Sequence, residues 1–191
     1  SLNAGTALAA NSGSGNNNIS STVVNSGTLV MAQTGGNDAI NGTLTVNNGG
    51  TVVMAGDNQV PAWQTVTLNE GSTLLVGNTS QAFTNLVITG DSVIDFGDGG
   101  SVLDINSVTV TNDAVLTIIN WNSAVDTFTA QTNPGDSVVQ VYYADTGTTG
   151  TYTTGSGTIT PGTPVPEPAA YGLLLLASSV ALGVWRSRKR T

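Results

Sequence analysis

Apolar and polar residues alternate in a short phrase that recurs along the first 112 residues of the chain. Its clearest copies lie at residues 22–27, 44–49 and 66–71, and the Asn at the fourth position of each copy recurs every 22 residues. Looser copies lie at residues 86–90 and 108–112. Because Asn and Gly tolerate the positive φ of a tight corner, each copy predicts a short strand that ends in a turn.

A second strand is expected after each copy of the phrase. With a period of two, the apolar side chains of these strands face the interior. They form the pairs Leu29 and Met31, Val52 and Met54, Leu74 and Val76, Ile94 and Phe96, and Leu116 and Ile118. A third inward position, just before the next copy, holds Ile40, Trp63, Phe83 and Ile105. The pattern predicts three short strands in every turn of 20 to 22 residues.

A turn of this length cannot bury its own apolar face, so successive turns have to stack as rungs about 4.8 Å apart. We therefore expect an all-β fold, a single-stranded right-handed parallel β-helix (solenoid) of about five rungs over residues 17–121. One internal column is expected to contain Val24, Val46, Leu68, Ile88 and Val110. The alternative is an antiparallel β-sandwich. The constant period favours the solenoid, because Asn25, Asn47 and Asn69 can then form an amide ladder on one corner.

The repeats resemble the β-solenoid passenger repeats of autotransporter-like bacterial surface proteins. The resemblance rests on the residue pattern at positions 45–52, Thr-Val-Asn-Asn-Gly-Gly-Thr-Val, and covers residues 17–121. It implies an architecture more than an activity.

The segments on either side of the repeats lack this period. Residues 1–16 are expected to form a disordered N-terminal segment, in a chain that lacks its original N-terminus. Residues 122–144 are expected to form a β cap on the open end of the coil, and residues 138–143 are its clearest strand. Residues 145–164 consist mainly of Thr, Gly, Ser and Pro, which predicts a flexible stalk or linker.

Charge is distributed very unevenly along the chain. Only 8 % of the 191 residues are charged, and the sequence contains neither Cys nor His. The basic residues, Arg186, Arg188, Lys189 and Arg190, all lie among the last six positions, so residues 1–185 carry twelve acidic side chains and no cation. Because nucleic-acid binding requires Lys or Arg to neutralise phosphates, this composition excludes nucleic acid as a partner.

An uncharged apolar segment, residues 169–185, directly precedes this basic end. Its seventeen residues reach the lower limit for a helix that crosses a hydrocarbon core of about 30 Å. Tyr171 and Trp185 suit the two membrane interfaces, and the basic end would stay in the cytoplasm. We therefore expect one C-terminal transmembrane helix with the rest of the chain facing outward. The alternative is a buried C-terminal helix of a soluble domain.

The residues Val165, Pro166, Glu167 and Pro168 stand just before the apolar segment. Together with that segment and the basic end, in this order, they resemble the PEP-CTERM sorting signal over residues 165–191. The resemblance implies that an exosortase, an integral membrane protease with a cysteine nucleophile, recognises and removes the tail during export. It also implies a location in the inner membrane before processing, and at the cell surface or in the extracellular matrix afterwards.

The sequence offers few side chains that could catalyse a reaction. Asp95, Asp98 and Asp104 lie within ten residues of one another and could serve glycoside hydrolysis as paired carboxylates. Ordinary strand and turn positions explain them better, and no Arg, Lys or His precedes residue 186 to assist them. We therefore expect no enzymatic activity and no cofactor. Calcium is the second-rank candidate, because residues 95–100, Asp-Phe-Gly-Asp-Gly-Gly, offer oxygen ligands.

Two functions remain open. The first is an exported structural or adhesive protein of the cell envelope or extracellular matrix. The alternative is a polysaccharide-binding, or less readily polysaccharide-processing, β-helix module. PEP-CTERM proteins are associated with bacteria that make exopolysaccharide, so the resemblance favours an envelope or biofilm-matrix role, with exopolysaccharide as a candidate partner, and names no ligand. A binding module usually exposes aromatic side chains in a row, whereas Trp63, Phe83 and Phe96 take inward positions. Trp121 and the tyrosines at 142–143 are the exceptions, and hence the candidates for contact with sugar.

Overall fold

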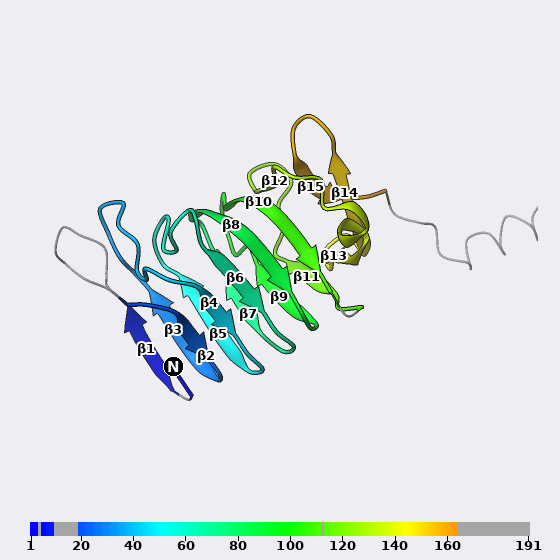
Figure 1. Ribbon diagram of the computed structural model, residues 1–191. Helices are drawn as coiled ribbons and strands as arrows, with labels where there is room; N and C mark the ends of the chain where they lie inside the picture. The colour runs from blue at the N-terminus through cyan, green and yellow to red at the C-terminus, as the bar shows by residue number, and fades with distance from the viewer. Residues whose placement is uncertain (4, 10–18, 112, 164–191) are drawn as a thin grey trace, which may run out of the picture.

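The computed structural model describes residues 1–3, 5–9, 19–111 and 113–163, in which the chain winds into a coil of parallel strands (Figure 1). The first face, built from the recurring phrase, holds β2 (Thr22–Val24), β4 (Leu44–Val46), β6 (Thr65–Leu68) and the second halves of β8 (Ser80–Ile88) and β10 (Val102–Val110). The second face holds β1 (Thr6–Ala9), β3 (Gly27–Met31), β5 (Gly50–Met54), β7 (Thr73–Leu75), β9 (Ser92–Asp95), β11 (Leu116–Ile119) and β13 (Val141–Tyr143). The third face holds the first halves of β8 and β10, followed by β12 (Thr127–Ala130).

The predicted internal column of the first face is confirmed. Val24, Val46 and Leu68 are successive Cα partners on adjacent parallel strands. The same register continues from Leu68 to Ile88 and from Ile88 to Val110. All five side chains are buried. Because the strands are parallel and belong to one coil, the structure excludes the antiparallel sandwich.

The second face supplies the other large part of the core. The predicted inward pairs are all buried, from Leu29 and Met31 in β3 to Leu116 and Ile118 in β11. The third face meets the first at a corner inside β8, where Thr84 and Asn85 are successive residues that are not buried. This break in the period of two turns the chain, so that Phe83 and Leu86 both point inward.

The coil makes about six turns, more than the predicted five, because it extends beyond residues 17–121 at both ends. At the C-terminal end, β12 and β13 lie in the segment predicted as a cap, but they pair in parallel with β10 and β11 and so continue the coil. At the N-terminal end, the first residues form an additional rung. Strand β1 pairs in parallel with β3, and Leu2 forms a bridge with Val24. The expectation of disorder is therefore wrong for residues 6–9. The sequence does contain a signal for this rung, because Leu2 and Asn3 stand 22 residues before Val24 and Asn25 of the recurring phrase.

The predicted amide ladder is confirmed at the corner that follows the first face. Asn47 Nδ2 donates to Asn25 Oδ1 at 2.6 Å, and Asn69 Nδ2 donates to Asn47 Oδ1 at 2.5 Å. The ladder extends one rung further in each direction, because Asn25 Nδ2 donates to Asn3 Oδ1 and Thr89 Oγ1 donates to Asn69 Oδ1. The five rungs from Asn3 to Thr89 are thus joined by one side-chain hydrogen bond at each step.

A second ladder of amides, which the sequence analysis did not identify, runs inside the coil. Gln33, Gln59 and Gln81 are buried. The backbone N–H of Gln33 donates to Gln59 Oε1 at 2.7 Å, and the backbone N–H of Gln59 donates to Gln81 Oε1 at 2.9 Å. Gln81 Nε2 in turn donates to the carbonyl of Gly56 at 2.7 Å. These bonds give hydrogen-bond partners to backbone N–H and C=O groups at the third face, where the first rungs have no strands.

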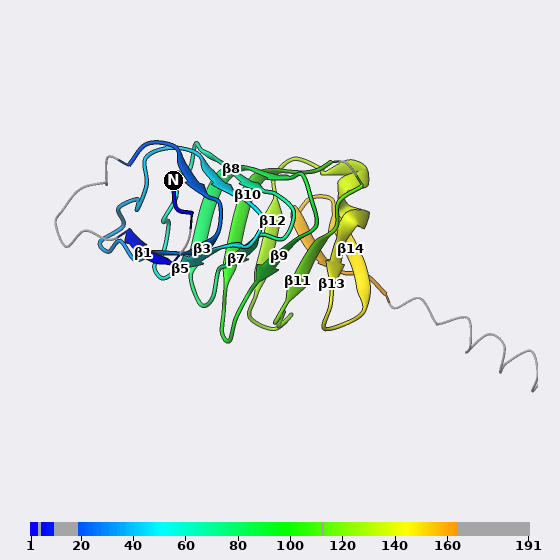
Figure 2. The same cartoon turned by 90° about the horizontal axis from the view of Figure 1, so that it is seen from below.

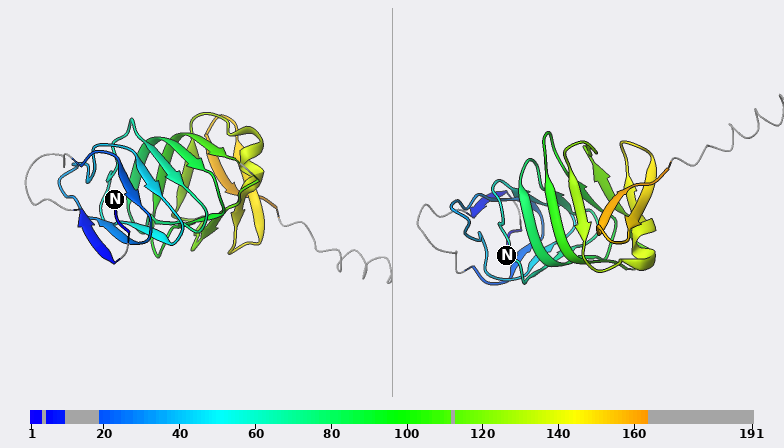
Figure 3. Two further views of the ribbon diagram at one scale, coloured as in Figure 1. Left: turned by 60° about the horizontal axis from the view of Figure 1, so that its bottom comes forward. Right: turned by 90° about the horizontal axis from the view of Figure 1, so that it is seen from above.

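The C-terminal end of the coil is closed by a 3-10 helix, η1 (Gly135–Gln140), and by two antiparallel strands, β14 (Thr148–Thr153) and β15 (Thr158–Pro161) (Figure 2). The predicted strand at 138–143 is therefore shortened to β13, because η1 begins after Pro134. Much of the predicted linker is strand: β14 pairs with β13, and β15 with β12. Thr-rich segments have a high β-propensity, and Gly147 and Gly157 supply positive φ at the turns. Figure 3 shows this cap at the end opposite the N-terminus.

Candidate functional site

The predicted sorting tail lies outside the described residues. This applies to Val165, Pro166, Glu167 and Pro168, to the apolar segment 169–185, and to the basic residues Arg186, Arg188, Lys189 and Arg190. Within residues 1–3, 5–9, 19–111 and 113–163, no helix has the length and apolarity needed to cross a membrane. The transmembrane helix therefore stays a prediction.

The carboxylates considered for catalysis or calcium do not form one site. Asp95 Oδ1 accepts hydrogen bonds from the backbone N–H of Gly97 and from Asn120 Nδ2, both at 2.8 Å. Asp104 lies on the third face, where its Oδ1 accepts a hydrogen bond from Thr129 Oγ1 at 2.6 Å. Nowhere in the described part of the chain do three acidic groups come together in a way that could hold a metal ion.

Tyr143, one of the residues proposed for sugar contact, belongs to the core. Its side chain is fully buried, and its hydroxyl donates a hydrogen bond to the carbonyl oxygen of Ile159 at 2.8 Å. Burial raises the pKa of the Tyr143 hydroxyl far above its ordinary value. The alternation of β13 instead places Tyr142 outside, where 38 % of its surface is exposed.

Trp121 packs mainly against other aromatic rings. Its ring centroid lies 4.9 Å from that of Phe96 and 5.2 Å from that of Tyr143, both in edge-to-face contacts. Its indole Nε1 is buried and has no hydrogen-bond partner among the described residues. Trp121 therefore helps to join the last rungs to the cap, and it also lines a small hollow of about 220 Å³.

Trp63 is the aromatic residue whose predicted position is wrong. It was expected to face inward, but 64 % of its surface is exposed. The backbone N–H of Gln64 donates to the carbonyl of Pro61, which closes a tight turn with Trp63 inside it. Pro61 is the signal that could have revealed this, because a residue without an N–H cannot continue a strand ladder. The core position in this rung is filled by Val60 instead.

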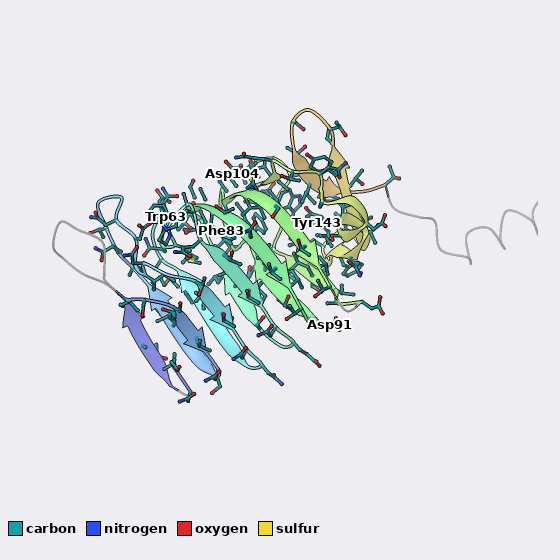
Figure 4. All side chains as sticks on the ribbon, in the orientation of Figure 1. Trp63, Phe83, Asp91, Asp104 and Tyr143 are labelled. Atoms are coloured by element: carbon teal, nitrogen blue, oxygen red, sulfur yellow. The ribbon has the colours of Figure 1, made fainter. Side chains whose placement is uncertain are left out.

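A polar groove lies beside this turn, along the third face. Its first hollow, of about 310 Å³, is lined by residues of successive rungs, including Ala62, Phe83, Asp104, Asn106 and Gln131. Gln131 also lines a second hollow of about 470 Å³, together with Asn133, Tyr152, Thr154 and Ser156. We call these two hollows the third-face groove. Trp63 does not belong to the lining itself, but it directly follows the lining residue Ala62 in the chain, and Figure 4 shows Trp63, Phe83 and Asp104 along the same edge of the coil.

The polar groups of the groove are available to a ligand. The side-chain amides of Asn106 and Gln131 have no hydrogen-bond partner among the described residues, and both residues are exposed. Asp104 uses Oδ1 for Thr129, which leaves its Oδ2 open. It is also the one charged side chain in the lining of either hollow. The groove therefore offers hydrogen-bond donors and acceptors with little charge.

The comparisons with known proteins contribute no relative. The chain matches no family model, no curated protein and no solved structure. The fold and the third-face groove therefore carry the functional argument, and membership of the PEP-CTERM group stays a hypothesis.

Proposed function

We propose that this chain is an exported structural or adhesive protein of a bacterial cell envelope or extracellular matrix. The observation that carries this proposal is the continuous coil, in which every rung hydrogen-bonds to the next and shares one apolar core. Such a body is a stiff rod whose length grows with the number of rungs, which suits a protein that extends from a surface.

The acidic residues support a non-enzymatic role. Asp95, Asp104 and Asp126 all accept hydrogen bonds from neighbouring strands or turns, which is a structural use of their oxygens. Catalysis by a carboxylate pair normally also needs a perturbed acid and a group that stabilises developing charge. The first 185 residues contain no Lys, Arg or His for the second task.

The C-terminal sequence supports sorting as a PEP-CTERM substrate. In this proposal residues 169–185 span the inner membrane, the basic end stays in the cytoplasm, and an exosortase acts next to Pro166, Glu167 and Pro168. The membrane and the exosortase are then the partners during export. After processing, the body remains at the cell surface or in the extracellular matrix.

Alanine replacement of Pro166, Glu167 and Pro168 tests this sorting proposal in a host that produces an exosortase. We expect a larger form of the protein that stays in the membrane fraction, because the protease no longer recognises the tail while the apolar span is intact. Immunoblots of membrane and extracellular fractions measure both properties. Pro164→Ala is the matched control, since it removes a nearby proline outside the motif. Processing of the triple variant like that of the parent would contradict the proposal.

A further inference from the structure

We propose that the third-face groove binds a chain of a neutral polysaccharide, with Trp63 as the aromatic platform for a sugar ring. The inference deepens the proposed function, on which it rests, because it names the chemical class of the partner to which the rod adheres. It starts from Trp63, a large indole that is 64 % exposed in a tight turn. An apolar ring face held on a rigid turn can stack against the apolar face of a sugar without a large loss of side-chain entropy.

The lining of the groove matches the hydroxyl groups of a sugar. The amides of Asn106 and Gln131 each offer donors and an acceptor, and the free oxygen of Asp104 offers a further acceptor. Ala62 and Ala82 give the lining an apolar part. An apolar surface with a few open polar groups is the usual composition of a ligand site.

Charge determines which polysaccharides fit. The described part of the chain contains neither Lys, Arg nor His, so no side chain there can neutralise a uronate, sulfate or phosphate group. Asp104 inside the groove would repel such groups, and the excess of acids over the whole body adds to the repulsion. The ligand is therefore uncharged.

The direction of the groove favours a polymer over a single sugar. Its residues come from successive rungs, because Asp104 in β10 is the Cα partner of Ala82 in β8 and of Thr129 in β12. Rungs repeat at about 4.8 Å, so the lining continues along the axis of the coil. Gln131 lines both hollows, and the second one includes Tyr152 and Thr154 of the cap.

The test measures binding of the full 191-residue chain, purified in an uncharged detergent, to a panel of soluble polysaccharides. Hydroxyethylcellulose, dextran, a galactomannan and a β-1,3-glucan are the neutral probes, and alginate is the anionic probe. Affinity electrophoresis and titration calorimetry give the dissociation constants. We expect at least one neutral polymer to bind the protein. Alginate should not bind, or should bind much more weakly than that polymer.

Trp63→Ala should weaken binding about tenfold, a loss typical of an exposed aromatic anchor. The double change Asn106→Ala and Gln131→Ala should weaken it about threefold or more. Tyr142→Ala is the matched control, because it removes an exposed aromatic ring from the second face and should leave affinity unchanged. Circular dichroism should show the same melting curve for Trp63→Ala and the parent, since Trp63 contributes little to the core.

Three results would overturn the inference: no binding to any neutral polymer, stronger binding to alginate, or equal affinity of Trp63→Ala and the parent. These outcomes are independent of export, because they are measured on purified protein. Normal sorting without polysaccharide binding would refute the groove alone. Binding without processing of the tail would refute the sorting proposal alone.

Discussion

At the scale of single residues, buried and half-buried polar groups hold neighbouring rungs together. The external Asn ladder could be foreseen, because its members recur at one position of the phrase. The internal Gln ladder could not, because Gln33 and Gln59 are 26 residues apart whereas Gln59 and Gln81 are 22 apart. Loops of different length bring these amides into line. A single sequence contains no local signal for that arrangement.

Tyr143 illustrates how burial of one residue couples stability to pH. In the unfolded chain its hydroxyl ionises near pH 10, whereas burial keeps the pKa of the folded state far higher. The contribution of Tyr143 is thus complete below about pH 10, and it falls by about 1.4 kcal/mol per pH unit above that value.

We therefore expect Tyr143→Phe to lower the free energy of unfolding at pH 7 by about 1 kcal/mol, because the hydrogen bond to Ile159 is lost. The stabilities of variant and parent should then converge near pH 11, because the variant has no hydroxyl to ionise. Urea denaturation between pH 7 and pH 11.5 measures this. The exposed neighbour provides the control, as Tyr142→Phe should change stability by less than about 0.5 kcal/mol at any pH. A constant gap across the range would contradict the argument.

At the scale of elements, the strands that repeat the phrase were predictable and the connections were not. Period-two alternation and constant spacing determined the inward residues of β4, β6 and β9, because each fits the rung before it. Trp63 departs from this rule, since a turn replaces a strand at that corner. The strands β14 and β15 were missed because they contain little apolar sequence and are ordered by the open edges that they cover. The groove was missed because its lining residues are distant in the sequence and come together only when the rungs stack.

Because each rung bonds only to its two neighbours, damage in one rung should spread along the axis by steps. Leu68 in β6 is fully buried between Val46 and Ile88. Leu68→Asp would place an unpaired charge in the core at a cost of several kcal/mol. We expect hydrogen exchange to accelerate most in β4 and β8 and least in β11, as a one-dimensional stack requires.

Two further variants make this experiment decisive. Leu68→Ala serves if Leu68→Asp unfolds the whole chain, because it should lower the free energy of unfolding by only about 2–5 kcal/mol. Hydrogen exchange should again accelerate more in the adjacent rungs than in distant ones. Glu70→Gln, at an exposed turn position two residues away, should cost less than about 0.5 kcal/mol and leave the exchange unchanged. Uniform loss of protection along the coil in Leu68→Ala would show a single cooperative unit and contradict the stepwise model.

At the scale of the whole molecule, the cap ends a stack that could otherwise continue. Parallel strands at the end of a coil present free N–H and C=O groups to any other strand. Here β15 and β14 pair antiparallel with the edges of β12 and β13, and the change of direction stops the parallel ladder. Ile159 anchors β15, because its side chain is fully buried and its carbonyl accepts the hydrogen bond of Tyr143. We therefore expect the cap to protect against association of coils end to end.

Ile159→Asp should release this cap, because it puts a carboxylate in place of a buried aliphatic side chain. The exposed edges of β12 and β13 should then pair with other chains, so we expect oligomers that grow with protein concentration. Sedimentation velocity of the full chain, in the same detergent as the parent, measures their size, and hydrogen exchange reports whether β14 and β15 have detached. Thr151→Asp introduces the same charge at an exposed position of β14 and should leave the sedimentation profile of the parent. If β14 and β15 exchange fast in Ile159→Asp but the chains do not associate more than the parent, the hairpin does not protect the open edges. That result would refute its protective role.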